Sequence, residues 1–194
     1  VADWLDRGDL AGRIPDFIAL AEARLDRVLR LRRMETEQVL NLAAGARSVS
    51  LPAGFREALG LWRIAPEGRI ALRFVTPGQL PVSTAAGRPD RWTIDGGSIA
   101  FERPGANAAS YALRMLGRLS LSDAAPTNPA LQDHPDLYLF ATLMEAAPYL
   151  RDAELLQMFA ARLEAALAEA RAQEARRGSL ARLSVEAPLA AEAS

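Results

Sequence analysis

The sequence predicts an α+β protein, a helical bundle of about three to four helices with an inserted antiparallel β region made of hairpins. Three observations predict this fold class. Apolar residues recur at helical spacing over 15–29, near the start of the chain, and over 135–147 and 152–177, near its end. Between these stretches, over 34–122, apolar runs are short and Gly and Pro recur, as in strands joined by turns.

The first helix is expected to begin at Pro15 and to carry one broad apolar stripe. Glu22 is expected on the polar side of the helical wheel, together with Asp26. Five arginines follow between Arg24 and Arg33, and their positive charge suits the negative end of the helix dipole. The stripe comprises Ile14, Phe17, Ile18, Ala21, Leu25, Val28 and Leu29.

The stretch 135–147 is apolar in nearly every direction around a helix, which predicts a buried helix at the centre of the fold. Only Asp136, Thr142 and Glu145 form a narrow polar strip. Pro135 suits the first helical position, because its missing N–H has no partner there in any case. Pro148 cannot continue the hydrogen-bond ladder, so the helix is expected to break there and restart a few residues later.

The β region is expected to consist of strand pairs, each joined by a turn. The strongest hairpin signal is Asp95-Gly96-Gly97, since glycines supply the positive φ angles of a tight turn. The predicted pairs are 35–42 with 48–51, 59–64 with 69–75, and 91–94 with 98–102, and a last strand covers 111–115.

Asp152 can cap a long final helix that runs to about Arg177 and stops at Gly178. Residues 178–194 are small, polar and aperiodic, which predicts a flexible C-terminal arm. We therefore expect a single domain over 1–177, with a helical body formed by 1–33 and 126–177 and a β insertion over 34–122.

The composition is that of an ordinary soluble globular protein, with half of the 194 residues apolar. A net charge of −1 supplies no global field to attract nucleic acid or an anionic membrane. Cysteine is absent, which excludes disulfides, thiolate catalysis and Cys-ligated metals. The sequence shows no basic leader and no apolar run of spanning length, so neither secretion nor membrane insertion is expected.

The sequence lacks a Walker loop, GxGxxG, GxSxG and HExxH, the common signatures of enzymes. Ser98 follows two glycines, but a hairpin turn lacks the elbow that a nucleophile requires. His134 precedes a proline and is expected to flank a helix start. Glu145 is expected to face water, an arginine or a neighbouring subunit. We therefore expect no enzymatic activity, no cofactor and no metal, and a hydrolase using Glu145 with His134 is the alternative from this class.

The arginine cluster between Arg24 and Arg33 suggests a different alternative. Five guanidiniums within ten residues would release counterions on contact with nucleic acid phosphates. Interleaved acidic residues and the lack of a suitably placed aromatic side chain favour a solvated or intersubunit charged face instead. A small helical nucleic-acid-binding protein that uses this helix is therefore the alternative function.

Two long segments resemble one known family. Residues 2–36, ADWLDRGDLAGRIPDFIALAEARLDRVLRLRRMET, resemble the first helices of phage head-to-tail adaptor (connector) proteins of the tail-tubular-protein-A-like group. Residues 121–170, which include the Pro-Tyr-Leu-Arg-Asp break, resemble their final two helices. The β middle is similar in pattern, with TPGQL and the DGG hairpin in the expected places.

The resemblance implies a structural virion protein at the head–tail junction of a bacteriophage, made and assembled in the host cytoplasm. Such proteins form a homo-oligomeric ring, usually a dodecamer, between the portal protein and a downstream tail or nozzle protein. The ring lines the channel through which genomic DNA passes without sequence-specific contact, and no membrane is involved.

The resemblance also implies how the chain would be held in such an assembly. The C-terminal arm would dock on the portal through Leu180, Arg182, Leu183 and Val185. A ring needs head-to-tail contacts between different faces of neighbouring copies. Our candidates for these intersubunit charged faces are Arg24, Arg27 and Arg30 on one side and Glu164 and Glu169 on the other.

Overall fold

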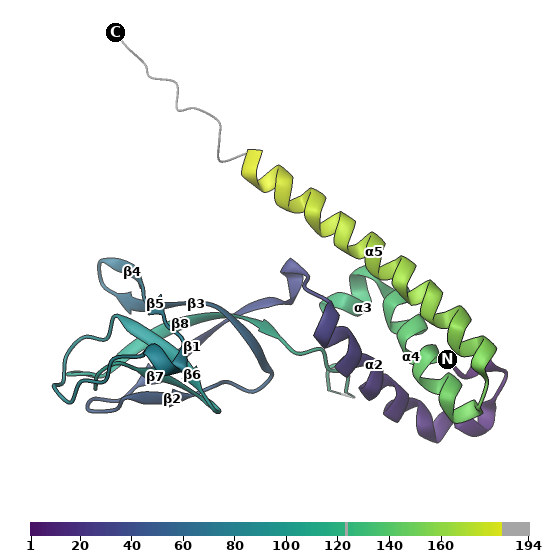
Figure 1. Ribbon diagram of the computed structural model, residues 1–194, viewed down its shortest axis with the longest axis horizontal. Helices are drawn as coiled ribbons and strands as arrows, with labels where there is room; N and C mark the ends of the chain where they lie inside the picture. Colours follow the sequence, from purple (N-terminus) through teal and green to yellow (C-terminus); the bar gives the residue numbers. More distant parts are fainter. Residues whose placement is uncertain (123, 184–194) are drawn as a thin grey trace, which may run out of the picture. The chain divides into compact units, whose positions relative to one another are not determined.

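The structure is a computed structural model that describes residues 1–122 and 124–183 (Figure 1). Internal contacts divide these residues into two compact units. The helical unit comprises 1–33 and the chain from Leu119 onwards, and the β unit comprises Met34–Arg118.

The predicted architecture, a helical bundle with an inserted set of hairpins, is wrong. The described residues form an α+β structure with two four-stranded sheets and five α-helices. The β region is therefore a compact unit with its own core and not a small insertion in a helical bundle. Several of its strand pairings join segments that are distant in the sequence, and the short-range turn signals on which the prediction relied do not report such pairing.

The helical unit begins with α1 (Ala2–Leu5), a 3₁₀ turn (Gly8–Arg13) and α2 (Ile14–Val28). A second 3₁₀ turn (Arg32–Met34) leads towards the β unit. After the β unit the chain forms α3 (Pro129–Asp133), α4 (Pro135–Leu150) and α5 (Ala153–Leu183). Helix α4 contacts both α2 and α5 (Figure 1).

Helix α4 is the buried helix that its composition predicts. Leu137, Ala141 and Leu143 are fully buried, and Thr142 of the predicted polar strip is buried as well. The Thr142 hydroxyl donates to the carbonyl oxygen of Tyr138 at 2.7 Å, which satisfies it within the helix. Burial on nearly all sides follows from its position between α2 and α5.

The predicted break at Pro148 is wrong, because α4 continues to Leu150. A proline in the last turn removes only one intrahelical hydrogen bond, which costs less than a proline in mid-helix. The helix ends instead at Arg151, which adopts a left-handed conformation with φ of 57°. Asp152 then caps α5 as predicted, since its carboxylate accepts a hydrogen bond from the Leu155 N–H at 2.9 Å.

Helix α5 also extends further than predicted, through Gly178 to Leu183. A single glycine costs about 1 kcal/mol in a helix, and the Ala, Arg and Leu residues around it are good helix formers. Phe159, Leu163, Leu167 and Ala170 of this helix are buried in the helical unit.

The β unit contains two sheets. The first has the order β1-β8-β3-β4 and the second β2-β7-β6-β5. The strands are β1 (Glu35–Leu42), β2 (Ser48–Ser50), β3 (Phe55–Ala65), β4 (Gly68–Ala71), β5 (Arg73–Phe74), β6 (Arg91–Asp95), β7 (Ser98–Phe101) and β8 (Ala109–Gly117).

The strands lie close to their predicted positions, but only two of the predicted hairpins form. β3 pairs with β4, and β6 pairs with β7. The predicted hairpin of β1 and β2 does not form, because β1 pairs with β8 and β2 pairs with β7. The predicted strand 69–75 is divided into β4 and β5, which belong to different sheets, and β5 pairs with β6 in parallel.

One apolar cluster fills the space between the two sheets, and it explains why the chain crosses between them. Leu113 and Tyr111 from the first sheet meet Phe101 and Trp92 from the second. Each sheet buries one face and leaves the other to solvent, as in a β-sandwich. The complete cluster is Leu40, Leu42, Leu61, Leu72, Trp92, Ile99, Phe101, Tyr111, Leu113 and Met115.

Candidate interaction surfaces

The arginine cluster at the end of α2 is partly neutralised within the helical unit. The Arg24 Nε lies 2.6 Å from Oε1 of Glu145 on α4, and Arg33 pairs with Asp133. The backbone N–H of Arg32 donates to the Glu174 carboxylate on α5 at 3.2 Å. Two of the five guanidiniums therefore already have carboxylate partners, which reduces the charge available for a phosphate backbone.

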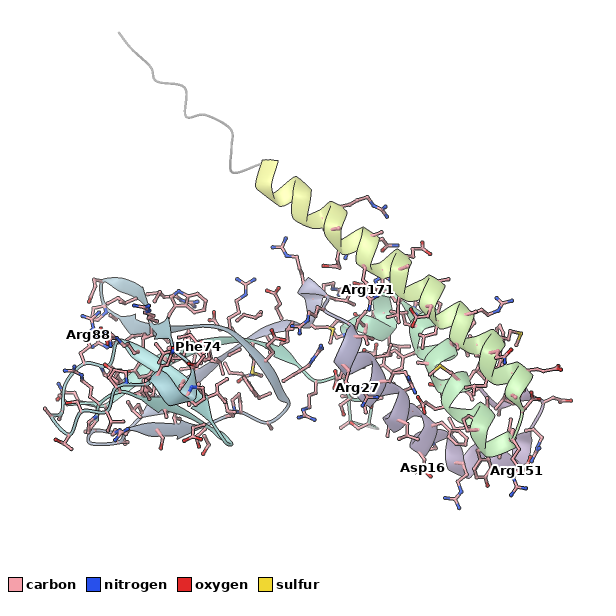
Figure 2. All side chains as sticks on the ribbon, viewed as in Figure 1. Asp16, Arg27, Phe74, Arg88, Arg151 and Arg171 are labelled. Atoms are coloured by element: carbon pink, nitrogen blue, oxygen red, sulfur yellow. The ribbon has the colours of Figure 1, made fainter. Side chains whose placement is uncertain are left out.

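Arg27 and Arg30 are exposed, whereas Arg24 is half-buried against Glu145 (Arg27 is labelled in Figure 2). Glu164 and Glu169 are exposed on α5. Because they are separated by five positions, their side chains point about 140° apart around the helix axis. The two acids thus lie on different flanks of α5 and do not form one continuous face.

The residues of the predicted portal-docking arm lie at the end of the described chain. Leu180, Arg182 and Leu183 belong to the last turns of α5. Val185 lies outside the described residues. The predicted arm therefore starts inside a helix and not directly after one.

The residues considered for catalysis are far apart or occupied. His134 is the residue directly before α4, and Glu145 follows it by eleven positions, a rise of about 16 Å, so they cannot act on the same atom. Glu145 pairs with Arg24, as the alternative of an arginine partner predicted. Ser98 is the first residue of β7 and pairs with Asp95 across the β6–β7 turn. Among the described residues, no group of three His, Asp or Glu side chains is arranged to hold a metal ion.

A buried polar network connects α2, α4 and the turn before α3. The Tyr138 hydroxyl donates to Oε1 of Glu22 at 3.1 Å, and it accepts a hydrogen bond from the Asn128 side chain. Asn128 in turn accepts from the Leu131 N–H at 2.9 Å and so caps α3. The network fixes the chain that returns from the β unit against α2.

Glu22 is buried, although its sequence position was assigned to the polar side of α2. Burial raises the pKa of its carboxyl above the usual value, while the hydrogen bond from Tyr138 opposes this rise. The burial of Glu22 could have been predicted from the sequence, because Glu22 lies four residues after Ile18 and three before Leu25, at the spacing of the apolar stripe.

An apolar groove opens in the β unit where strand pairing is incomplete. β4 pairs only with the Trp62–Ala65 end of β3, and β5 pairs only with Arg91 and Trp92 of β6. Between these edges lies a groove of about 600 Å³. Phe74 is 51% exposed there and stacks edge-on against Trp92 (Figure 2 labels Phe74). Exposed apolar surface of this kind is typical of protein contact sites. Its apolar lining comprises Phe55, Leu59, Leu72, Phe74, Trp92 and Ile94.

Comparison with known families decides the assignment. A family model described as SU10 adaptor protein matches residues 1–186, which includes both units. The chain belongs to the SU10 adaptor protein family. A search of curated proteins finds no match.

Membership of the SU10 adaptor family indicates a phage head–tail adaptor, and it implies a location at the head–tail junction of the virion and contact with portal and tail proteins. It also suggests a structural role instead of an enzymatic one. No helix among the described residues has the length and apolar character to cross a membrane. The match does not distinguish the tail-tubular-protein-A-like group from other adaptors, so that finer resemblance stays a prediction.

Proposed function

We propose that this SU10-family adaptor forms a ring between the portal and the tail of a phage, and the resemblance implies twelve copies. The observation that carries the proposal is the family match over residues 1–186, which leaves no large part of the chain for another activity. The ring would offer the attachment surface for the tail or nozzle protein. Genomic DNA would pass through its lumen without sequence-specific contact.

Neighbouring copies in the ring are proposed to meet through charged faces of the helical unit. Arg27 and Arg30, with Arg24 beside them, form the basic face at the end of α2. Glu164 and Glu169 supply acidic groups on different flanks of α5. The basic face of one copy would therefore meet only one of these two acids on the neighbouring copy. Contacts between different faces of the same chain are what closes a ring.

The C-terminal arm is proposed to dock on the portal through Leu180, Arg182, Leu183 and Val185. Support comes from the length of α5, since a helix of 31 residues extends for about 46 Å. Among the α5 side chains whose burial is described, which end at Arg177, Ala170 is the last buried one. A portal partner would contact the helix beyond this point.

The nucleic-acid-binding alternative receives less support. Arg24 and Arg33 are engaged with Glu145 and Asp133, which leaves fewer free guanidiniums than the sequence suggests. A duplex-binding titration separates the two functions. Salt-dependent binding that falls on changing Arg27 and Arg30 to alanine would favour the alternative.

Electron microscopy of the purified chain mixed with the portal protein of the same genome tests the adaptor proposal. The expected result is a ring that caps the portal. A chain truncated after Leu183 retains the whole described helix, and a chain truncated after Gly178 also lacks Leu180, Arg182 and Leu183. Loss of the complex only with the shorter chain would assign docking to the last helical turn. No complex with any chain, given an intact portal, would contradict the proposal.

Charge reversal tests the intersubunit faces. Arg27→Glu is expected to prevent ring formation on the portal. Combining it with Glu164→Arg or with Glu169→Arg is expected to restore rings for only one of these two second substitutions. Arg13→Glu, at the other end of the same helical stretch, is the matched control, because it makes the same charge change on an exposed arginine. Equal rings from all variants in electron micrographs would remove these faces from the proposal.

A further inference from the structure

A small pocket of about 70 Å³ opens in the β unit, between the segment Gly87–Pro89 and the segment 105–109. Backbone hydrogen bonds hold its two sides together. The Gly87 N–H donates to the Pro104 carbonyl oxygen at 2.9 Å, and the Ala106 N–H donates to the Gly87 carbonyl oxygen at 3.0 Å. The pocket is therefore formed in advance of any ligand.

Two arginines line this pocket. Arg63 comes from β3, where it lies directly opposite Tyr111 of β8, and Arg88 comes from the segment before β6 (labelled in Figure 2). Arg63 lies two residues from the buried Leu61, so strand alternation points it to the inner side of the sheet, at the end of the sandwich. Within the described residues, no carboxylate forms a salt bridge with Arg63 or Arg88.

The third group belongs to Tyr111, a residue that also lines the pocket. The Tyr111 side chain is fully buried, and its hydroxyl has no hydrogen-bond partner among the described residues. A buried hydroxyl without a partner is costly and calls for an explanation, such as a ligand that accepts its proton in a hydrogen bond. The pocket thus combines two free cations with one free donor.

The electrostatics around Tyr111 fit an anionic ligand. Burial raises the pKa of the Tyr111 hydroxyl above its usual value, so it remains a neutral donor, and Arg63 and Arg88 are close enough to act in the opposite direction. Glu102 is the nearby acid, but its carboxylate accepts the N–H groups of Asp90 and Arg91 at 3.0 Å and lies 3.3 Å from the Arg103 Nε. The charge of Glu102 is therefore already compensated.

We propose that this pocket binds a phosphate group, with Arg63 and Arg88 on its charged oxygens and the Tyr111 hydroxyl donating to a third oxygen. Two guanidiniums suit a phosphate, which carries between one and two negative charges at neutral pH, and guanidinium N–H groups fit its oxygens geometrically. A carboxylate carries only one charge, so it would leave more of the positive charge of the two arginines uncompensated.

The same chemistry has two sources, namely inorganic phosphate and a phosphate of a nucleic acid strand. The buried position of the Tyr111 hydroxyl favours the free ion, because a phosphodiester carries a sugar on each of two oxygens. The pocket of about 70 Å³ is small, which also favours the smaller free ion.

Titration of the full chain with inorganic phosphate, followed by ³¹P NMR and by the thermal midpoint Tm in a chloride background of constant ionic strength, tests the site. We expect saturable binding and a rise in Tm. Arg88→Gln, an exposed position that the fold does not need, should weaken binding at least tenfold, and Arg63→Gln should do the same. Arg13→Gln in the helical unit, at an exposed arginine, is the control with the same loss of charge, and it should bind as the unchanged chain does.

Tyr111→Phe gives the sharpest readout. Removal of the hydroxyl, which has no partner, should raise Tm without phosphate and should also reduce the rise in Tm that phosphate causes. If Tyr111 had only a structural role, the variant would leave the phosphate-dependent rise in Tm unchanged. An equal rise in Tm for all variants would show a general salt effect and overturn the proposal. Equal binding of acetate would overturn the assignment to phosphate.

A short DNA duplex in competition distinguishes the sources. We expect no displacement of inorganic phosphate by the duplex. Displacement that is lost in Arg88→Gln would confirm the phosphate chemistry and assign it to a nucleic acid strand.

Discussion

Each unit of this adaptor buries a tyrosine, and the two tyrosine hydroxyls differ in their hydrogen bonds. In the helical unit, Tyr138 is buried with its hydroxyl bonded to both Glu22 and Asn128. In the β unit, Tyr111 is equally buried and its hydroxyl has no partner among the described residues. The first arrangement holds helices that are distant in sequence in one position. The second leaves the Tyr111 hydroxyl at the end of the sandwich able to donate a hydrogen bond to a ligand.

The difference follows from the two architectures. Helices satisfy their own backbone groups, so side chains are free to form bridges from one helix to the next. In the sandwich, the space between the sheets is filled by apolar side chains such as Leu113 and Phe101. A polar atom at the margin of such a core finds few partners. Buried polar groups without partners are therefore better indicators of a binding site here than satisfied ones.

The largest expected effect tests whether the two cores are separate. Phe101→Ala in the β unit and Phe159→Ala in the helical unit each remove a buried aromatic ring and should cost about 3–5 kcal/mol. In urea titrations, the fluorescence of buried Trp92 should report mainly the effect of Phe101→Ala on the β unit. Far-UV circular dichroism should report mainly the effect of Phe159→Ala on the helical unit. If both probes moved together for either variant, the two units would unfold as one and the comparison would fail.

The same chemical change should have opposite signs in the two units. Tyr138→Phe removes the side-chain donor of the buried Glu22 carboxylate and should destabilise the chain by about 1–3 kcal/mol. Tyr111→Phe removes a hydroxyl that has no partner and should stabilise it by about 1 kcal/mol. Urea midpoints in phosphate-free buffer measure both values. A loss of stability in Tyr111→Phe would show that the hydroxyl is satisfied in solution.

Glu22→Gln tests the charge in the polar network. Because burial raises the pKa of Glu22 in the folded state, the unchanged chain loses stability as the pH rises from the usual pKa of glutamate through the raised value. The variant cannot ionise and can still accept from Tyr138, so it should be the more stable chain at pH 7. Below about pH 4, where both forms are neutral, the two urea midpoints should converge. A constant difference at all pH values would contradict this assignment.

The smallest effect is expected at an exposed ion pair. Glu37 on β1 accepts two hydrogen bonds from Arg69 on β4, at 2.6 and 2.8 Å, and these lower the pKa of Glu37. Their contribution is present above the usual pKa of glutamate and is lost as the pH falls through the lowered value. Exposed pairs are screened by solvent, so Glu37→Gln should leave the urea midpoint at pH 7 nearly unchanged. A large shift would show that this pair joins the two edge strands more firmly than its exposure suggests.

Local features of the structure were predictable from local sequence. Strand β1 covers Glu35–Leu42 as predicted, and the turn after Asp95 forms the expected hairpin, because alternation and glycine placement are local signals. The buried character of α4 was equally visible in its composition. The ends of helices were less so, since α4 passes Pro148 and α5 passes Gly178, where packing and neighbouring helix formers outweigh one unfavourable residue.

The candidate surfaces also divide into features that the local sequence predicted and features that it did not. The arginine cluster was visible in the sequence, but its partners Glu145 and Asp133 lie about a hundred or more residues away and could not be deduced from spacing. The phosphate pocket was not predicted at all. Arg63 and Tyr111 become neighbours only through the pairing of β3 with β8.

By itself, the sequence determined which segments become helices and strands and, through a resemblance over nearly its whole length, the family of phage adaptors. Tertiary structure alone decided that β1 and β2 belong to different sheets, that Glu22 is buried, and that two arginines converge on a tyrosine hydroxyl. The physical reason is that periodicity and turn chemistry act over a few residues. Strand pairing, burial and charge compensation depend on groups that folding brings together from distant parts of the chain.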